Sequence, residues 1–211
     1  SDIFLQTKIW NESQGFERTK KAADKCLERL GRDHVDMLLI HWPCPEKDLF
    51  VETWKAFIEL RDEGKAKSIG VSNFRAEDLR RIVDETGVVP ALNQIELHPL
   101  IDQTRMIAHL ASKGIPVEAY SPLAQGKVMK NAMLREIAAV HYASPAQIAL
   151  AWVLTRPMSI ALPRTGNKNR LADNLGAADI MLSAEEIASI DALGSAEGRL
   201  VSPETLAPAW D

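Results

Sequence analysis

The sequence has few cysteines: in 211 residues only Cys26 and Cys44 occur, and neither lies in a CxxC pair or a Cys/His cluster. A disulfide framework and a zinc site are therefore both disfavoured, and we expect no bound metal. So few cysteines, without any pairing pattern, fit a reducing compartment, and we expect a cytoplasmic protein.

Long apolar runs and blocks of like charge are missing as well. No stretch approaches the ~20 apolar residues that a bilayer span requires. The 29 acidic and 25 basic residues are spread along the chain and leave a formal net charge of −4. No run of like charges resembles the tails that bind nucleic acid. We therefore expect a soluble protein that binds neither nucleic acid nor a membrane.

The sequence does contain a regular alternation of amphipathic helical segments and short β-rich apolar segments, which predicts a parallel α/β fold. A helical pattern from Phe16 to Leu30 ends before Gly31, which can take the left-handed position after a helix. Further helices are expected before Gly64, Gly87 and Gly114, and after the capping signals that begin at Ser144 and Ser183. Six strands are expected, at residues 3–7, 35–40, 68–71, 91–95, 115–119 and 159–162.

Six strands allow two architectures. A complete TIM-type (β/α)8 barrel has eight βα units in about 250 residues. Six units in 211 residues therefore indicate such a barrel without its beginning, forming one incomplete domain over residues 1–211. An open doubly wound sheet is the competing interpretation, which composition does not exclude. That sheet normally carries a GxGxxG turn between a strand and a helix, and this sequence has none.

Each predicted strand is followed by polar residues, and in a barrel the carboxyl ends of the strands meet where the catalytic loops gather. Taken alone, each of these residues is more often an ordinary solvated, packed or capping residue. Six polar ends in succession favour a shared functional site. In chain order they are Lys8, His41, Ser72-Asn73, Gln94, Tyr120-Ser121 and Arg164-Thr165.

The residues around these ends resemble the aldo-keto reductase family across nearly the whole chain. The matching segments are Thr7-Lys8-Ile9-Trp10, Leu39-Ile40-His41-Trp42-Pro43, Gly70-Val71-Ser72-Asn73-Phe74, Asn93-Gln94-Ile95-Glu96 and Tyr120-Ser121-Pro122-Leu123. The C-terminal Arg199-Leu200-Val201-Ser202-Pro203 and Leu206-Ala207-Pro208 are similar to bacterial 2,5-diketo-D-gluconate reductases of the B type. The resemblance implies an oxidoreductase that reduces small aldehydes, ketones or keto sugars by hydride transfer from NADPH.

The resemblance also implies a role for each matching residue. Lys8 would lower the pKa of a catalytic tyrosine, because an ammonium stabilises a nearby phenolate, and His41 would orient the carbonyl. Trp10 and Trp42 would wall the substrate pocket. The expected cofactor residues are Ser72, Asn73 and Gln94 at the carboxamide, Tyr120 on the nicotinamide ring, Ser121, Leu123 and Gln125 along the pyrophosphate, and Arg164, Thr165, Arg170 and Asn174 at the adenosine end with its 2′-phosphate. At Arg164 and Thr165 the family usually has lysine and serine.

Family members carry a catalytic aspartate and tyrosine ahead of the strand that holds the lysine. Nothing before Lys8 matches that motif, and neither Tyr120 nor Tyr142 does. We therefore expect on the order of 40–60 residues, two βα units, to precede Ser1 in the natural protein, which we expect to be a monomer. This chain alone is then expected to be inactive. Two alternatives stay open: an NADPH-binding regulatory subunit and a catalytically silent truncated form.

Overall fold

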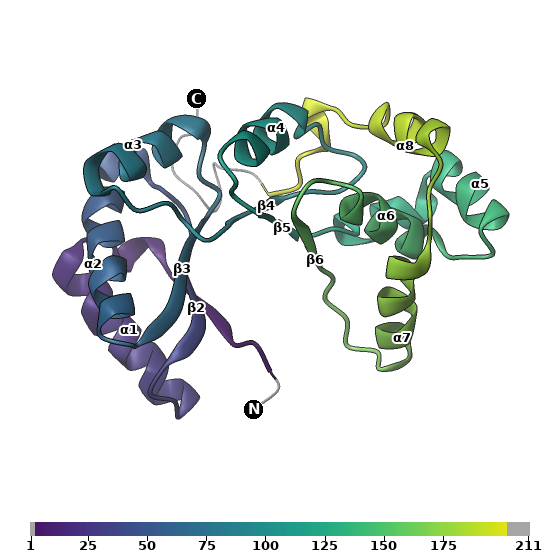
Figure 1. Ribbon diagram of the computed structural model, residues 1–211. Coiled ribbons are helices and arrows are strands. Elements are labelled where there is room, and N and C mark those ends of the chain that lie inside the picture. The colour runs from purple at the N-terminus through teal and green to yellow at the C-terminus, as the bar shows by residue number, and fades with distance from the viewer. Residues whose placement is uncertain (1–2, 202–211) are drawn as a thin grey trace. The chain divides into compact units, whose positions relative to one another are not determined.

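The computed structural model describes residues 3–201, which fall into two compact units. Of these residues, 3–93 belong to the first unit and 94–201 to the second. Both units alternate strands and helices, as the sequence predicts (Figure 1). The single domain over residues 1–211 stays a prediction.

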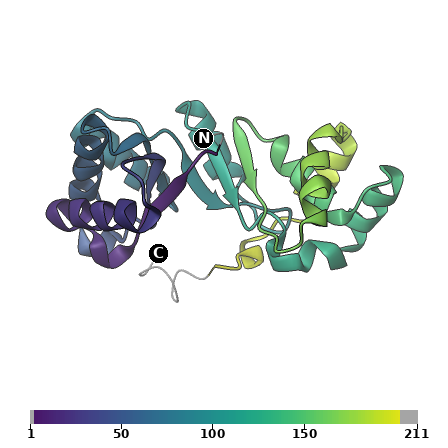
Figure 2. The same ribbon diagram turned by 90° about the horizontal axis from the view of Figure 1, so that it is seen from below.

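The first unit is built on a parallel sheet in the order β1-β2-β3. Its strands are β1 (Gln6–Ile9), β2 (Val35–Ile40) and β3 (Ala66–Ser72), and its helices are α1 (Phe16–Leu30), α2 (Phe50–Asp62) and α3 (Ala76–Thr86). Two short 3-10 helices, η1 (Asn11–Ser13) and η2 (Pro45–Lys47), follow the first two strands. Helices α1 and α2 lie side by side along this sheet (Figures 1 and 2). Strand order follows chain order because each helix returns the chain beside the strand it has just left.

The core of the first unit lies between β2 and its neighbours. Leu39 and Ile40 of β2 are fully buried, as is Trp54 of α2. Strands covered on both faces carry such continuous apolar runs. Gly70 of β3 permits the close approach of its neighbours, since a Cβ there would lie 2.8 Å from Leu39 Cδ2 and 3.0 Å from the Leu92 carbonyl oxygen.

The second unit contains three further strands in the order β4-β5-β6. They are β4 (Asn93–Glu96), β5 (Val117–Tyr120) and β6 (Ser159–Leu162). The helices are α4 (Thr104–Ser112), α5 (Ala132–Val140), α6 (Pro145–Leu154), α7 (Asn169–Gly176) and α8 (Ala184–Asp191), with 3-10 helices η3 (Ala124–Lys130), η4 (Ala177–Asp179) and η5 (Ala196–Gly198). The predicted capping boxes at Ser144 and Ser183 are confirmed. Within residues 3–201 no single helix is long and apolar enough to cross a membrane; by length and composition alone, α5 and α6 together, bent by 88°, meet that test.

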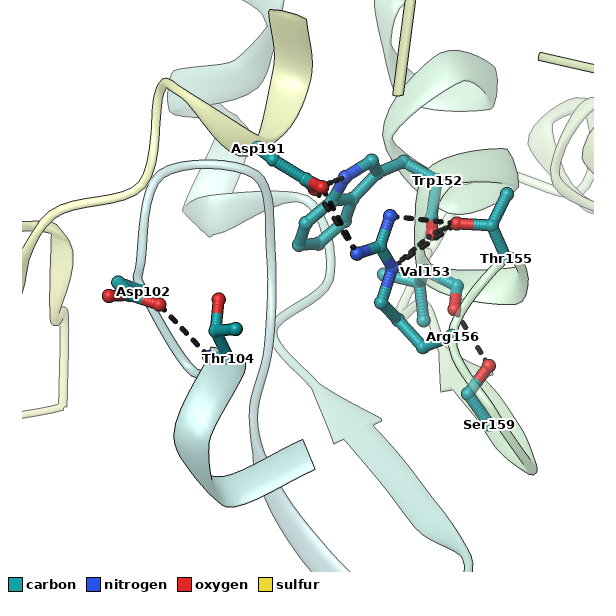
Figure 3. A network of polar contacts seen from close by, with 8 residues as sticks. All are labelled: Asp102, Thr104, Trp152, Val153, Thr155, Arg156, Ser159 and Asp191. Carbon is teal, nitrogen blue, oxygen red and sulfur yellow. Dashed lines mark hydrogen bonds and ion pairs between the residues drawn. The ribbon is translucent and has the colours of Figure 1, made fainter. Parts of the chain in front are cut away.

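A polar network joins the central helix α6 to α8 (Figure 3). The indole Nε1 of Trp152 donates to the Asp191 carboxylate at 2.7 Å. The guanidinium of Arg156 lies 4.5 Å from the Trp152 ring centroid and 3.1 Å from an Asp191 oxygen. Beyond the helix, the Ser159 hydroxyl donates to the Val153 carbonyl at 2.7 Å. The Asp191 carboxylate thus binds both the buried Trp152 indole N–H and the Arg156 guanidinium, and these contacts hold α8 against the end of α6.

The bounds of four strands differ from the sequence-based expectation, and one helix was not expected; β4, for example, is Asn93–Glu96 rather than residues 91–95. The first strand is Gln6–Ile9 rather than residues 3–7, so Lys8 lies within β1. Ser72 and Tyr120 likewise close β3 and β5 instead of following them. The cause is that backbone pairing, not apolar composition, sets where a strand ends. Helix α5 was not predicted; its signal was Asn131, whose side chain accepts from the Leu134 amide at 3.1 Å and caps the helix.

Candidate active site

Strand register places three predicted site residues on one face of the first unit's sheet. Lys8 lies opposite Leu39 of β2, and Leu39 lies opposite Gly70 of β3. His41 and Ser72 come two residues further along their strands, and side chains two residues apart point to the same face. The His41 amide also donates to the Ile9 carbonyl at 3.1 Å, which extends the pairing to the histidine. Lys8, His41 and Ser72 therefore share the sheet face that carries Leu39.

Two tryptophans surround the His41 imidazole. The Trp10 ring meets it edge to face, with centroids 4.7 Å apart, and the Trp42 ring lies nearly parallel to it, 6.5 Å away. Gln14 donates its Nε2 to the Trp42 carbonyl at 2.6 Å and fixes this turn. Trp10 is 39% exposed and Trp42 only 2%. Trp10 thus offers surface to a substrate, whereas Trp42 backs the imidazole, so the predicted pocket-wall role suits Trp10 better.

His41 is electrically neutral at physiological pH. Burial, assisted by the positive charge of Lys8, lowers the pKa of His41 to about 4. A neutral imidazole keeps one ring N–H as a hydrogen-bond donor. It can therefore polarise a carbonyl oxygen without transferring a full proton, as neutral histidines do in other barrel enzymes.

The loop after β3 is locked to the end of β2. Asn73 has a left-handed backbone, φ 62°, which asparagine tolerates better than most residues. Its Nδ2 donates to the His41 carbonyl at 3.0 Å and lies 3.1 Å from the Ser72 hydroxyl. Asn93, which sequence reasoning missed, clamps the next residue by donating to the Phe74 carbonyl at 2.8 Å. The only signal in the sequence was an asparagine within an expected strand; the structure shows that all four residues of β4 are buried.

In the second unit, the predicted cofactor residue Gln94 sits in a buried polar pair. Its Nε2 donates to the carboxylate of Glu118 on β5, and the two residues are 2% and 4% exposed. Glu118 was not singled out from the sequence. The signal was a carboxylate between Val117 and Ala119 in a strand otherwise suited to the core.

Tyr120 closes β5, opposite Leu162 of β6. Burial above all, and then the negative charge of Glu96, raises the pKa of the Tyr120 phenol above its usual value. A phenol held in this way is a poor proton donor at neutral pH. The environment thus agrees with the predicted stacking role and gives no support to Tyr120 as general acid.

The loop after β5 has an unusual backbone. Ser121, Ala124 and Gln125 all have positive φ, at 50°, 48° and 52°. The Ala124 amide donates to the Ser121 carbonyl at 2.9 Å, and the Gly126 amide donates to the Leu123 carbonyl at 2.8 Å. Leu123, with φ −97° and ψ 10°, is followed by Ala124 in the left-handed region, and such a succession forms a backbone concavity that suits anions. The predicted pyrophosphate contacts, Ser121, Leu123 and Gln125, all lie on this loop.

The segment after β6 carries three exposed cations near the start of α7, namely Arg164, Lys168 and Arg170. Arg164 and Arg170 have no carboxylate partner among residues 3–201. Between them the Thr165 hydroxyl accepts from the Asn167 amide at 3.1 Å. Asn174 is half-buried further along α7. Guanidinium groups suit phosphate oxygens in charge and geometry, so this segment fits the anionic ligand expected there.

A second buried carboxylate outside the predicted set, Glu96, ties β4 to the C-terminal segment. It is 1% exposed and accepts from His98 Nε2 at 3.0 Å, from the Leu200 amide at 2.7 Å and from the Val201 amide at 3.1 Å. Burial alone would raise the pKa of Glu96, but the donors outweigh it and hold the pKa below its usual range. The C-terminal residues 202–208, which contributed to the predicted resemblance, lie outside the described residues.

Comparison with known proteins identifies the class. The model of the aldo/keto reductase family matches residues 1–195. A glyoxal reductase of Bacillus subtilis is 38% identical over 97% of this chain and 73% of its own length. An alanine variant of Gox0644, solved in complex with NADPH, superposes with a TM-score of 0.91 at 41% identity, over 97% of this chain and 75% of its own.

The chain belongs to the aldo/keto reductase family and is an enzyme of that family. The predicted α/β barrel class is confirmed by its relatives. A structure provisionally described as a 2,5-diketo-D-gluconic acid reductase B is 36% identical, covers 100% of this chain and 74% of its own, and superposes with a TM-score of 0.93.

Proposed function

We propose that the protein reduces small carbonyl compounds to alcohols with NADPH, and that Lys8 and His41 belong to its catalytic machinery. The observation that carries this proposal is the pairing of a neutral imidazole with a lysine on one sheet face, beside the exposed ring of Trp10. His41 would donate a hydrogen bond to the carbonyl oxygen and Lys8 would supply a fixed positive charge nearby. Both effects stabilise the negative charge that grows on the oxygen as a hydride reaches the carbon.

The polar groups of both units suit NADPH. Ser72, Asn73 and Gln94 carry the hydroxyl and amide groups that a carboxamide can bind, and Tyr120 offers a half-buried aromatic ring. The loop with Ser121, Leu123 and Gln125 would hold the pyrophosphate, and Arg164, Thr165, Arg170 and Asn174 the adenosine end with its 2′-phosphate. When bound, NADPH supplies the hydride. The NADPH complex of the 41% identical Gox0644 variant supports this choice of cofactor.

For the substrate we propose a small carbonyl compound with a second oxygen next to the reacting carbonyl, such as an α-oxoaldehyde. The name of the Bacillus subtilis glyoxal reductase supports this class. A half-buried imidazole beside an indole edge provides one hydrogen-bond donor and a small apolar wall, which fits a compact, flat molecule.

The test is a turnover assay on the natural full-length protein. NADPH consumption would be followed with glyoxal, methylglyoxal, a keto sugar and the simple aldehyde propanal as the control without a second oxygen. We expect turnover of the carbonyl panel, with the α-oxoaldehydes ahead of propanal. Tight NADPH binding without turnover of any compound would overturn the proposal and favour a regulatory cofactor-binding subunit.

A further inference from the structure

A buried side-chain contact joins the adjacent strands β4 and β5 of the second unit: Gln94 Nε2 donates to the carboxylate of Glu118. Gln94 is 2% exposed and Glu118 is 4% exposed. A carboxylate removed from water to this degree lowers stability unless donors compensate it. Carbonyl reduction as described above gives Glu118 no direct task, so its place beside Gln94 needs another reason.

The chemistry of the contact fixes the orientation of the Gln94 amide. An ionised carboxylate only accepts hydrogen bonds, so the Gln94 group that faces Glu118 is the nitrogen. The amide is planar, and its oxygen therefore points to the other side. Without a neighbour of this kind the two ends of a glutamine amide are nearly equivalent and can exchange places.

We propose that Glu118 is a positioning residue that holds the Gln94 amide in one orientation and so presents Gln94 Oε1 as the acceptor for the carboxamide NH2 of the nicotinamide. This inference rests on the proposed function, because it requires Gln94 to bind that carboxamide. Its consequence is selectivity: the site distinguishes a carboxamide, which carries the NH2 donor, from a group of the same shape that lacks it.

A cofactor analogue isolates this one interaction. In the 3-acetylpyridine analogue of NADP+ a methyl group replaces the carboxamide NH2, while the carbonyl oxygen and the rest of the molecule are retained. The unaltered full-length protein should bind NADP+ roughly two- to tenfold more tightly than the analogue, the effect of one hydrogen bond between neutral groups. Binding would be measured by quenching of tryptophan fluorescence, which needs no turnover.

Three substitutions test the role of Glu118. In Glu118→Ala the preference for NADP+ over the analogue should disappear, because the Gln94 amide loses its fixed orientation. Glu118→Asp, which keeps the charge and most of the volume but withdraws the carboxylate by about 1.5 Å, should lose the preference too. Glu118→Gln should lose most of it as well, because the new amide can donate as well as accept and no longer determines which end of the Gln94 amide faces it. The matched control is Glu136→Ala on the exposed face of α5, which should behave like the unaltered protein.

The outcomes separate the inference from the function it rests on. No NADP+ binding by the unaltered protein would overturn the proposed function. An unchanged preference in a folded Glu118→Asp or Glu118→Ala variant, checked by its melting temperature, would overturn the positioning role alone. If Glu118→Gln kept the full preference, the accepting-only chemistry of Glu118 would not set the orientation of Gln94 and the inference would be wrong.

Discussion

Replacing Glu96 by alanine should lower the free energy of unfolding by about 1–3 kcal/mol, the usual effect of leaving a buried hydrogen-bonding group without its partner. Glu96 is 1% exposed and His98 is 0% exposed, so the histidine would lose its partner out of reach of water. The amides of Leu200 and Val201 would lose their acceptor as well. These two are only part-buried and can regain water, so most of the loss comes from His98.

The lowered pKa of Glu96 also predicts how the stability of the fold changes with pH. The folded-state pKa of Glu96 lies below its usual value, because the donors outweigh the opposing effect of burial. A carboxylate of this kind stabilises the fold above the unfolded-state pKa, about 4.3, and loses that contribution as the pH falls through the folded-state value. Glu96→Gln removes the ionisation while keeping the shape. Its stability should therefore fall less than that of the unaltered protein between about pH 5 and pH 3.

Urea unfolding at several pH values measures both effects, and hydrogen exchange at Leu200 and Val201 shows whether the C-terminal segment is released first. Exchange at these amides should be faster in Glu96→Ala, while amides of β2 keep their relative order. A stability loss below about 1 kcal/mol would show that the contacts of Glu96 contribute no more than an ordinary surface group. An unchanged pH slope in Glu96→Gln would refute the assignment of the lowered pKa.

Four further predictions concern the proposed site and the α6–α8 network. Arg170→Met should weaken NADPH binding by about tenfold to a hundredfold, and NADH binding little, because one charge-assisted contact is lost; equal losses for both cofactors would contradict a 2′-phosphate role. Lys8→Met should lower kcat by about a hundredfold or more with NADPH affinity unchanged, and near-normal turnover would remove Lys8 from the mechanism. His41→Ala should lower kcat/KM, and in the unaltered enzyme no ionisation of His41 should appear near its ordinary pKa of about 6.5, because burial lowers that pKa to about 4. Trp152→Phe should cost about 1.5–3 kcal/mol in urea unfolding through the lost hydrogen bond to Asp191, and a loss within error would show that Arg156 alone satisfies that carboxylate.

Much of the fold could be predicted because its signals are local. A serine before proline with glutamine three residues after the serine marked the start of α6, and the same logic at Ser183 marked α8. Gly31 ends α1 in the left-handed conformation that glycine adopts without strain, φ 61°. Strand ends were less predictable, as Lys8 shows. Its strand continues to Ile9 because β2 supplies hydrogen-bonding partners, and a partner strand is not visible in the local sequence.

The candidate site was predictable where its residues follow the strands and less so where they lie within them. His41 and Asn73 belong to recognisable segments at strand ends, and the structure gives both a defined environment. Glu118 was missed because it lies inside a strand that reads as apolar core, and Glu96 was missed because it is the last residue of a mostly polar strand, where a carboxylate is expected to face solvent. Their partners, the C-terminal amides and Gln94, are distant in sequence, so only the folded chain reveals why a charge is tolerated there.

The buried polar residues of β4 and β5 allow a functional role to be distinguished from a contribution to stability. Gln94 and Glu96 lie two residues apart on β4, so their side chains point to the same face of that strand. An apolar pair at either position would stabilise the fold at least as well, since well-packed hydrophobic residues commonly replace buried charged groups without loss. The protein has polar side chains at these positions instead, and each carboxylate holds a neighbouring group in place. Glu118 orients the Gln94 amide, and Glu96 orients His98 and the amides of residues 200 and 201. If orientation is the reason for both carboxylates, replacing both partners with apolar residues, Gln94→Leu together with Glu118→Leu, should preserve or raise the melting temperature while abolishing the cofactor preference. A simple structural role predicts that the two properties fall together.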